Sequence, residues 1–182
     1  MTVSGVNNAN SNAGIYTTGA AVIGGGAGTA YGYLSRPFLT KYGVPTDSFI
    51  EKVIDIDEPG FQKFFNNIEK AKSNEEIKKL SLKFYPGEEI DEDFRGIPIG
   101  EIKNKIKVFY LDRMNEFKKG FADYWDSTKK TFINCDDEDG QMFKKAAQSI
   151  QRKHAAIYGA IGAAVLGLGA YLATKKKEKP EA

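Results

Sequence analysis

The hydrophobic and polar positions divide the chain into two uncharged end segments and a charged middle. The C-terminal segment, residues 155–174, has the sequence AAIYGAIGAAVLGLGAYLAT, and a Lys-rich tail follows at residues 175–182. Twenty helical residues rise about 30 Å, which matches the hydrocarbon thickness of a bilayer. The pattern therefore predicts a transmembrane helix at residues 155–174. A buried helix in the core of a soluble protein is the alternative.

The N-terminal segment, residues 13–34, is also uncharged but is a weaker candidate. Its composition is dominated by Gly, Ala and Thr, so its hydropathy is marginal for a membrane helix. A polar flexible leader is expected before it, at residues 1–12. We expect a second, Gly-rich transmembrane helix at residues 13–34, and the alternative is that this segment belongs to the flexible leader. The absence of Lys and Arg before Arg36 disfavours a secretory signal peptide.

Small residues recur every four positions in both end segments. Such rows let the backbone of a neighbouring helix approach closely, and they resemble the glycine zippers of membrane helices. If both segments span, the two helices run antiparallel. Their small faces then pack against each other or against other copies of the chain, giving a homo-oligomer. The predicted helix-packing residues are Ala20, Gly24, Gly28, Gly32, Ala155, Gly159, Ala163 and Gly167.

Aromatic and cationic side chains flank the two segments at positions suited to the two membrane–water interfaces. A basic juxtamembrane helix is expected at residues 141–154, where cations can contact anionic lipid. The predicted membrane-interface residues are Tyr16, Tyr31, Tyr33, Tyr158, Tyr171, Arg152, Lys153, Lys175, Lys176 and Lys177.

The charged middle predicts a soluble helical domain at residues 46–140, after a linker at residues 35–45. Apolar residues recur there at steps of three and four, as on one face of a helix. Ser73 and Glu76 form a capping box that starts one short helix, and the Pro86-Gly87 pair ends it.

A long amphipathic helix is predicted from Pro98 to about Ile133. Its aromatic stripe packs in the core of a small bundle or, alternatively, is exposed to a partner protein along residues 99–133. The acidic turn at residues 134–140 is expected to place its carboxylates at the N-terminus of the last helix. The stripe comprises Ile102, Ile106, Phe109, Tyr110, Met114, Phe117, Phe121, Tyr124, Trp125 and Phe132.

These patterns together predict an all-α protein. We expect a small helical bundle or hairpin domain with a long amphipathic helix, flanked by a weaker N-terminal and a stronger C-terminal transmembrane helix, both rich in Gly and Ala.

The charge distribution argues against nucleic acid as a partner. Between Ser35 and His154 there are 22 basic and 22 acidic side chains, so the net charge of +2 comes from the Lys-rich tail. Phosphate binding requires a net basic surface. We therefore expect the lipid bilayer, and not nucleic acid, to be the main partner.

The chain offers little for catalysis or metal binding, with one Cys and one His. It contains no nucleophile elbow, zinc-protease motif or Cys pair. The glycines at 24–28 lack the spacing of a dinucleotide-binding turn, and the loop at 134–140 lacks the acids that a calcium loop needs at its ends. The acidic run at 88–93 is more typical of a solvated surface. We expect no enzymatic activity, no cofactor and no metal.

The sequence thus favours a membrane-anchored scaffold or adaptor that acts through its helical domain. The alternative is a secreted effector or pore-forming protein whose glycine-zipper helices insert into a target membrane. Within about 15 residues of the two segments, the middle carries six cations and the termini carry four, which favours a cytoplasmic middle by a small margin.

Overall fold

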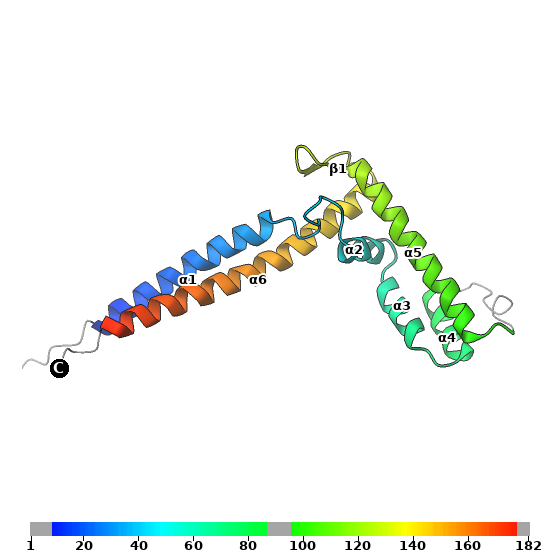
Figure 1. The fold of residues 1–182 in the computed structure, drawn as a ribbon, viewed down its shortest axis with the longest axis horizontal. Helices are drawn as coiled ribbons and strands as arrows, with labels where there is room; N and C mark the ends of the chain where they lie inside the picture. Colours follow the sequence, from blue (N-terminus) through cyan, green and yellow to red (C-terminus); the bar gives the residue numbers. More distant parts are fainter. Residues whose placement is uncertain (1–8, 87–95, 178–182) are drawn as a thin grey trace, which may run out of the picture. The chain divides into compact units, whose positions relative to one another are not determined.

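The computed structural model describes residues 9–86 and 96–177. These residues are mostly helical, with one two-stranded sheet, which confirms the predicted all-α class (Figure 1). The chain divides into two compact units: Met1–Pro37 with Gln148–Ala182, and Phe38–Ala147. We call the first the helical hairpin and the second the domain. The acidic run at residues 88–93 lies outside the described residues.

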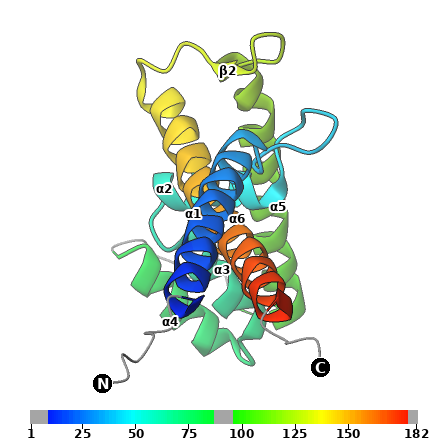
Figure 2. The same ribbon diagram turned by 90° about the vertical axis from the view of Figure 1, so that its left-hand side faces the viewer.

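The helical hairpin consists of α1 (Ala9–Leu34) and the C-terminal part of α6 (Glu138–Lys177). The two lie side by side in both views of the ribbon (Figures 1 and 2). They run antiparallel, because Gly32 near the end of α1 lies against Ala155 near the start of this part of α6. α1 includes residues 9–12, which the sequence pattern places in a polar leader.

The described residues of the domain form four further helices, a short β-hairpin and the first turns of α6. Each helix start follows from local sequence. The Thr46 hydroxyl accepts a hydrogen bond from the Phe49 amide, and the Ser73 hydroxyl accepts one from Glu76, as the capping box predicts. The elements are α2 (Asp47–Asp57), α3 (Phe61–Lys70), α4 (Asn74–Phe84), α5 (Ile99–Tyr124), β1 (Trp125–Asp126), β2 (Thr131–Phe132) and residues 138–147 of α6.

The predicted extension of the long helix to about Ile133 is wrong. α5 ends at Tyr124, and β1 pairs antiparallel with β2, with Trp125 opposite Phe132. The Asp126 carboxylate accepts hydrogen bonds from two backbone amides of the following turn, each at 2.9 Å. Such local bonds from Asp compete with helical hydrogen bonds and so end the helix. The candidate partner-binding helix 99–133 is therefore a helix and a β-hairpin.

An aromatic core holds the domain together. Phe49 is fully buried on α2, and its ring lies 5.4 Å from the rings of both Phe38 and Phe121 and 6.1 Å from that of Phe143. Phe38, from the segment expected to be a linker, is 1% exposed and also contacts the Trp125 ring. The core thus takes its first side chain from immediately after the helical hairpin.

A second apolar cluster joins α3, α4 and α5. Its fully buried members are Ile68, Ile77 and Ile102, each 0% exposed, and Leu80 and Ile106 pack against them. The two clusters cover Ile102 and Phe121 of the predicted aromatic stripe, whereas Phe109 of the same stripe stays 49% exposed.

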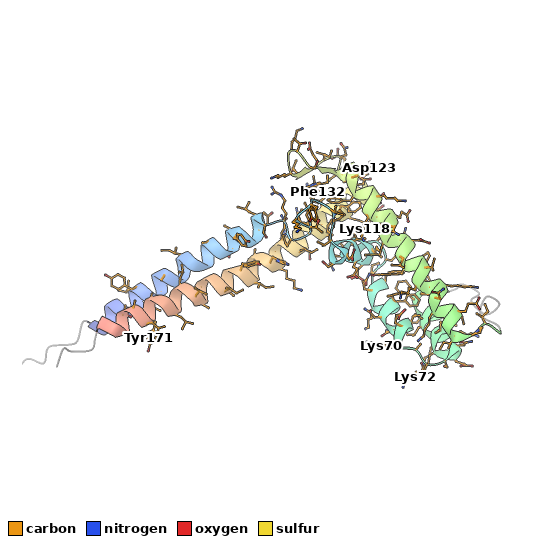
Figure 3. All side chains as sticks on the ribbon, viewed as in Figure 1. Lys70, Lys72, Lys118, Asp123, Phe132 and Tyr171 are labelled. Atoms are coloured by element: carbon orange, nitrogen blue, oxygen red, sulfur yellow. The ribbon has the colours of Figure 1, made fainter. Side chains whose placement is uncertain are left out.

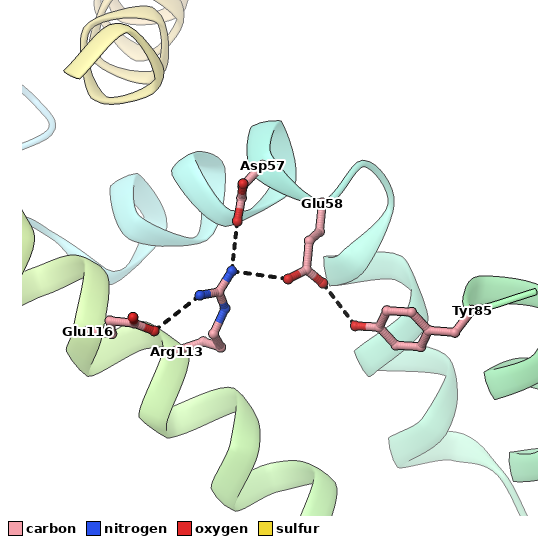
Figure 4. Close-up of polar contacts among 5 residues, drawn as sticks. All are labelled: Asp57, Glu58, Tyr85, Arg113 and Glu116. Carbon is pink, nitrogen blue, oxygen red and sulfur yellow. Dashed lines mark hydrogen bonds and ion pairs between the residues drawn. The ribbon is translucent and has the colours of Figure 1, made fainter. Parts of the chain in front are cut away.

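An ion-pair cluster around Arg113 joins α5 to the end of α2 (Figure 4). The guanidinium donates hydrogen bonds to Asp57 at 2.7 Å and to Glu58 at 3.1 Å, and its other terminal nitrogen donates to Glu116 at 3.1 Å. Glu58 also accepts a hydrogen bond from the Tyr85 hydroxyl at 2.9 Å. Because these groups are partly exposed, the cluster fixes geometry more than it adds stability.

Candidate membrane-spanning hairpin

One helix in the described part of the chain is long and apolar enough to cross a membrane. It is α6 over Glu138–Thr174, and only 17% of its most apolar stretch is buried. A core helix of a soluble protein would be mostly covered by its neighbours. α1 is long enough at 26 residues, but its Gly and Thr content leaves it too weakly apolar to qualify by itself.

The contact between α1 and α6 is made through glycine backbone. A Cβ at Gly24 would lie 2.7 Å from the Gly162 carbonyl carbon, and a Cβ at Gly28 would lie 2.6 Å from that of Tyr158. Real Cβ atoms essentially never lie so close to backbone atoms. The helices can therefore reach this separation only because these positions are glycine.

On α6 the residues that contact α1 are spaced by three and by four positions. Gly159 lies against Thr29, Ala163 against Gly25, and Gly167 against Ala21. These are accompanied by Gly162, which a strict four-residue row omits. A helix has 3.6 residues per turn, so positions facing one neighbour alternate between steps of three and four. This periodicity is the signal that would have identified Gly162.

The outer surface of the helical hairpin is apolar. Many of its large apolar side chains stay exposed, in contrast to the buried apolar side chains of the domain. The aliphatic side chains with the highest exposure are Ile15 (68%), Val22 (69%), Ile23 (69%), Leu34 (67%), Val165 (61%) and Leu168 (62%). A surface of this kind requires an apolar environment or a partner.

Three hydroxyl side chains of the helical hairpin donate hydrogen bonds to backbone carbonyls three or four residues earlier. The Thr29 hydroxyl donates to the Gly25 carbonyl at 2.8 Å, and the Ser35 hydroxyl donates to Gly32 at 3.0 Å. The Thr174 hydroxyl donates to the Tyr171 carbonyl at 2.8 Å. Hydroxyl groups satisfied in this way are compatible with a hydrocarbon environment, which offers no water as a partner.

The predicted interface residues lie near the two ends of the helical hairpin. At the end where α1 finishes, the rings of Tyr31 and Tyr158 meet edge to face at 5.2 Å, and the Gln151 amide donates to the Tyr33 carbonyl at 3.1 Å. At the other end, Tyr171 projects outward from α6 (Figure 3).

The remaining predicted site residues also fall on the helical hairpin. Tyr16 is 66% exposed, and Arg152 and Lys153 are exposed. Ala20 is half-buried, one residue before the Ala21 contact with Gly167. The side chains of Lys175, Lys176 and Lys177 lie outside the described residues.

The chain's single cysteine, Cys135, is half-buried, and its thiol donates a hydrogen bond to the Ile133 carbonyl at 3.2 Å. Burial raises the pKa of the Cys135 thiol, while nearby Lys144 acts in the opposite direction. A raised pKa disfavours the thiolate, which is the nucleophilic form. Within residues 9–86 and 96–177, no group of three or more His, Cys, Asp or Glu side chains is placed to hold a metal ion.

Comparison of the chain with known protein families, with curated proteins and with solved structures finds no match. The function is therefore inferred from the chain's own residues.

Proposed function

We propose that the protein is a non-enzymatic integral membrane protein in which α1 and the C-terminal part of α6 cross the bilayer together and anchor the domain as a scaffold or adaptor. The observation that carries this proposal is that different residues of the helical hairpin form its helix contact and its outer surface. Glycine backbone makes the contact between the helices, and the large apolar side chains remain on the outside.

Paired insertion explains how the weaker helix spans. α1 is too weakly apolar to qualify alone, but packing against α6 covers the backbone at Gly24 and Gly28 and leaves Val22 and Ile23 to face lipid. Close packing of small residues is a principal source of helix association in membranes. The stronger helix thus supports the weaker one.

The antiparallel arrangement defines the topology of the proposed anchor. Both chain termini lie on one side of the bilayer and the domain lies on the other. Six cations near the spans on the domain side against four on the terminal side favour a cytoplasmic domain. The adaptor role is assigned to the domain because its α5 exposes Val108 (49%), Phe109 (49%) and Leu111 (48%), apolar side chains available to a partner protein.

A charged substitution on the lipid-facing surface tests insertion directly. Leu168 is 62% exposed, so Leu168→Asp leaves the α1–α6 contact intact. In a bilayer the Asp costs about 3 kcal/mol near the centre of a spanning helix. We expect this variant to lose resistance to carbonate extraction from expressing cells. Leu82→Asp, at a 39% exposed site of the domain, is the matched control and should stay in the membrane pellet.

The extraction experiment has a clear negative outcome. If the wild-type chain is released by carbonate, or if Leu168→Asp and wild type are retained equally, lipid does not cover the outer face of the helical hairpin and the proposal fails. Protease digestion of intact vesicles, with a tag at each terminus of the chain, measures the topology. Equal accessibility of the two tags is expected for paired spanning helices.

The pore-forming alternative is favoured by one observation, the weak apolarity of α1. A weakly apolar helix can remain soluble before insertion and then enter a target membrane with its partner. Purified protein added to liposomes distinguishes the two functions. A resident anchor leaves a trapped dye inside, whereas an inserting effector is recovered without detergent and releases the dye.

A further inference from the structure

A tight loop follows α1 and presents an aromatic side chain to solvent. Leu39 and Pro45 form an antiparallel bridge, and within it the Thr40 amide donates to the Val44 carbonyl at 2.8 Å. The Gly43 amide donates back to the Thr40 carbonyl at 3.0 Å, and Gly43 has a φ of +78°. These bonds and the left-handed glycine fix the loop conformation.

Two large apolar side chains of this loop are exposed to solvent. Tyr42 is 80% exposed and Val44 is 52% exposed, although the loop is held at its base by buried Phe38 and Pro45. The Lys41 ammonium lies 4.9 Å from the centre of the Tyr42 ring. A closed loop with an aromatic tip, an aliphatic neighbour and an adjacent cation matches the chemistry of the membrane–water interface, where Tyr and Lys are favoured.

Chain connectivity keeps this loop close to the end of the helical hairpin. Tyr42 follows Leu34, the last residue of α1, by eight positions, so their Cα atoms are at most about 29 Å apart. Gln151 is bonded to Tyr33 at the same end of the helical hairpin. The chain therefore leaves α1 and enters this part of α6 at the same end of the helical hairpin.

Charge also favours a lipid surface over a basic partner. Between residues 35 and 46 the chain carries two cations, Arg36 and Lys41, and no acid. Anionic headgroups attract such cations when these lie close to the surface.

We propose that the loop Thr40–Val44 is a membrane-contact loop, which places Tyr42 and Val44 in the headgroup region of the same anionic bilayer that holds the helical hairpin. This inference rests on the proposed membrane anchor. The loop would act as a third attachment point and limit the orientations that the domain adopts at the surface.

Lipid-attached quenchers test the contact with the full chain reconstituted in vesicles of phosphatidylcholine and phosphatidylglycerol. Tyr42→Trp introduces a reporter at an exposed position. The native Trp125 is 9% exposed and provides the baseline measured on wild type. We expect the emission added by Tyr42→Trp to shift to the blue and to be lost when the vesicles contain lipid with a quencher near the headgroup.

Phe109→Trp is the matched control. Phe109 is 49% exposed on α5, sixteen residues before Trp125, or about 24 Å along the helix from the end that contacts Phe38. The emission that this substitution adds should be insensitive to the lipid quencher. The same vesicles are floated on a density gradient, so that insertion of the helical hairpin is measured separately from contact of the loop.

The outcomes separate the two proposals. Co-flotation with quenching of the added emission in Tyr42→Trp, and not in Phe109→Trp, supports the membrane-contact loop. Co-flotation with equal quenching of the added emission in the two variants overturns the loop contact and leaves the anchor in place. Failure to co-float overturns both. Quenching that disappears when phosphatidylglycerol is omitted would identify the cations as the main attraction.

Discussion

Two glycines on α1, two residues apart, give the sharpest test of how the helical hairpin is built. A Cβ at Gly24 would lie 2.7 Å from the carbonyl carbon of Gly162, with the Gly162 oxygen closer still. A Cβ at Gly26 would meet nothing within 4 Å. We therefore expect Gly24→Ala and Gly26→Ala, which are chemically identical changes in one helix, to have opposite effects on the α1–α6 pair.

The magnitude follows from the geometry. Ordinary contact begins at 3.4 Å, so relieving the contact with the Gly162 carbonyl carbon alone forces the helices apart by about 0.7 Å, and the closer carbonyl oxygen requires more. Overpacking of this kind costs about 1–3 kcal/mol. Alanine also gains up to about 1 kcal/mol of helix propensity over glycine, equally at both sites. The propensity gain cancels in the comparison, so Gly24→Ala should be less stable than Gly26→Ala by about 1–3 kcal/mol.

The assay is energy transfer between dyes on the two helices during SDS titration of the protein in detergent micelles. Gly14→Cys and Gly169→Cys, in a Cys135→Ser background, provide open labelling sites because a Cβ at either glycine meets nothing within 4 Å. A difference of 1.4 kcal/mol is a tenfold change in the separation equilibrium. Equal stability of the two alanine variants would refute the close backbone contact.

Three further predictions concern the pairing, the core and one tyrosine. A Cβ at Gly25 would lie 3.5 Å from the Ala163 Cβ, so cysteines at both positions should oxidise to a disulfide within one chain. A dimer band on a non-reducing gel would instead mean that the helices pair between copies of the chain. Phe49→Ala should lower the free energy of unfolding of the domain by about 3–5 kcal/mol in urea denaturation followed by tryptophan fluorescence, because the ring is fully buried. Burial and a hydrogen bond to Glu51 raise the pKa of Tyr110 to about 12. The stability that this shift adds is therefore present below pH 10 and is lost between pH 10 and 12. Ultraviolet titration of the wild type and of Tyr110→Phe measures the pKa.

Local signals in the sequence located most of the helices. The capping box at Ser73 and Glu76 and the Thr46 cap involve residues three apart, so they depend little on the rest of the fold. The acidic turn before α6 works in the same way, since the Asp137 carboxylate accepts a hydrogen bond from the Gly140 amide at 2.7 Å. Interactions of this range can be predicted from sequence alone.

The β-hairpin and the core position of Phe38 could not be predicted in this way. Trp125 and Phe132 fit the helical spacing of the preceding stripe, yet they face each other across two strands and both contact the Phe38 ring. That arrangement depends on an aromatic residue almost ninety positions earlier in the chain. Periodicity reports which side chains are apolar, whereas the partner that covers them is decided by tertiary packing.

The energetics of the helical hairpin differ between water and lipid. Contacts between glycine backbones, as at Gly24 and Gly162, remove little apolar surface from water, and hydrophobic stabilisation is proportional to that area. In water, the pair would leave Val22 and Leu168 exposed and gain little in return. In lipid, those side chains incur no such cost, and the close backbone approach contributes van der Waals contacts that association requires there. The same contact surface is therefore suited to a bilayer and poorly suited to a soluble two-helix bundle.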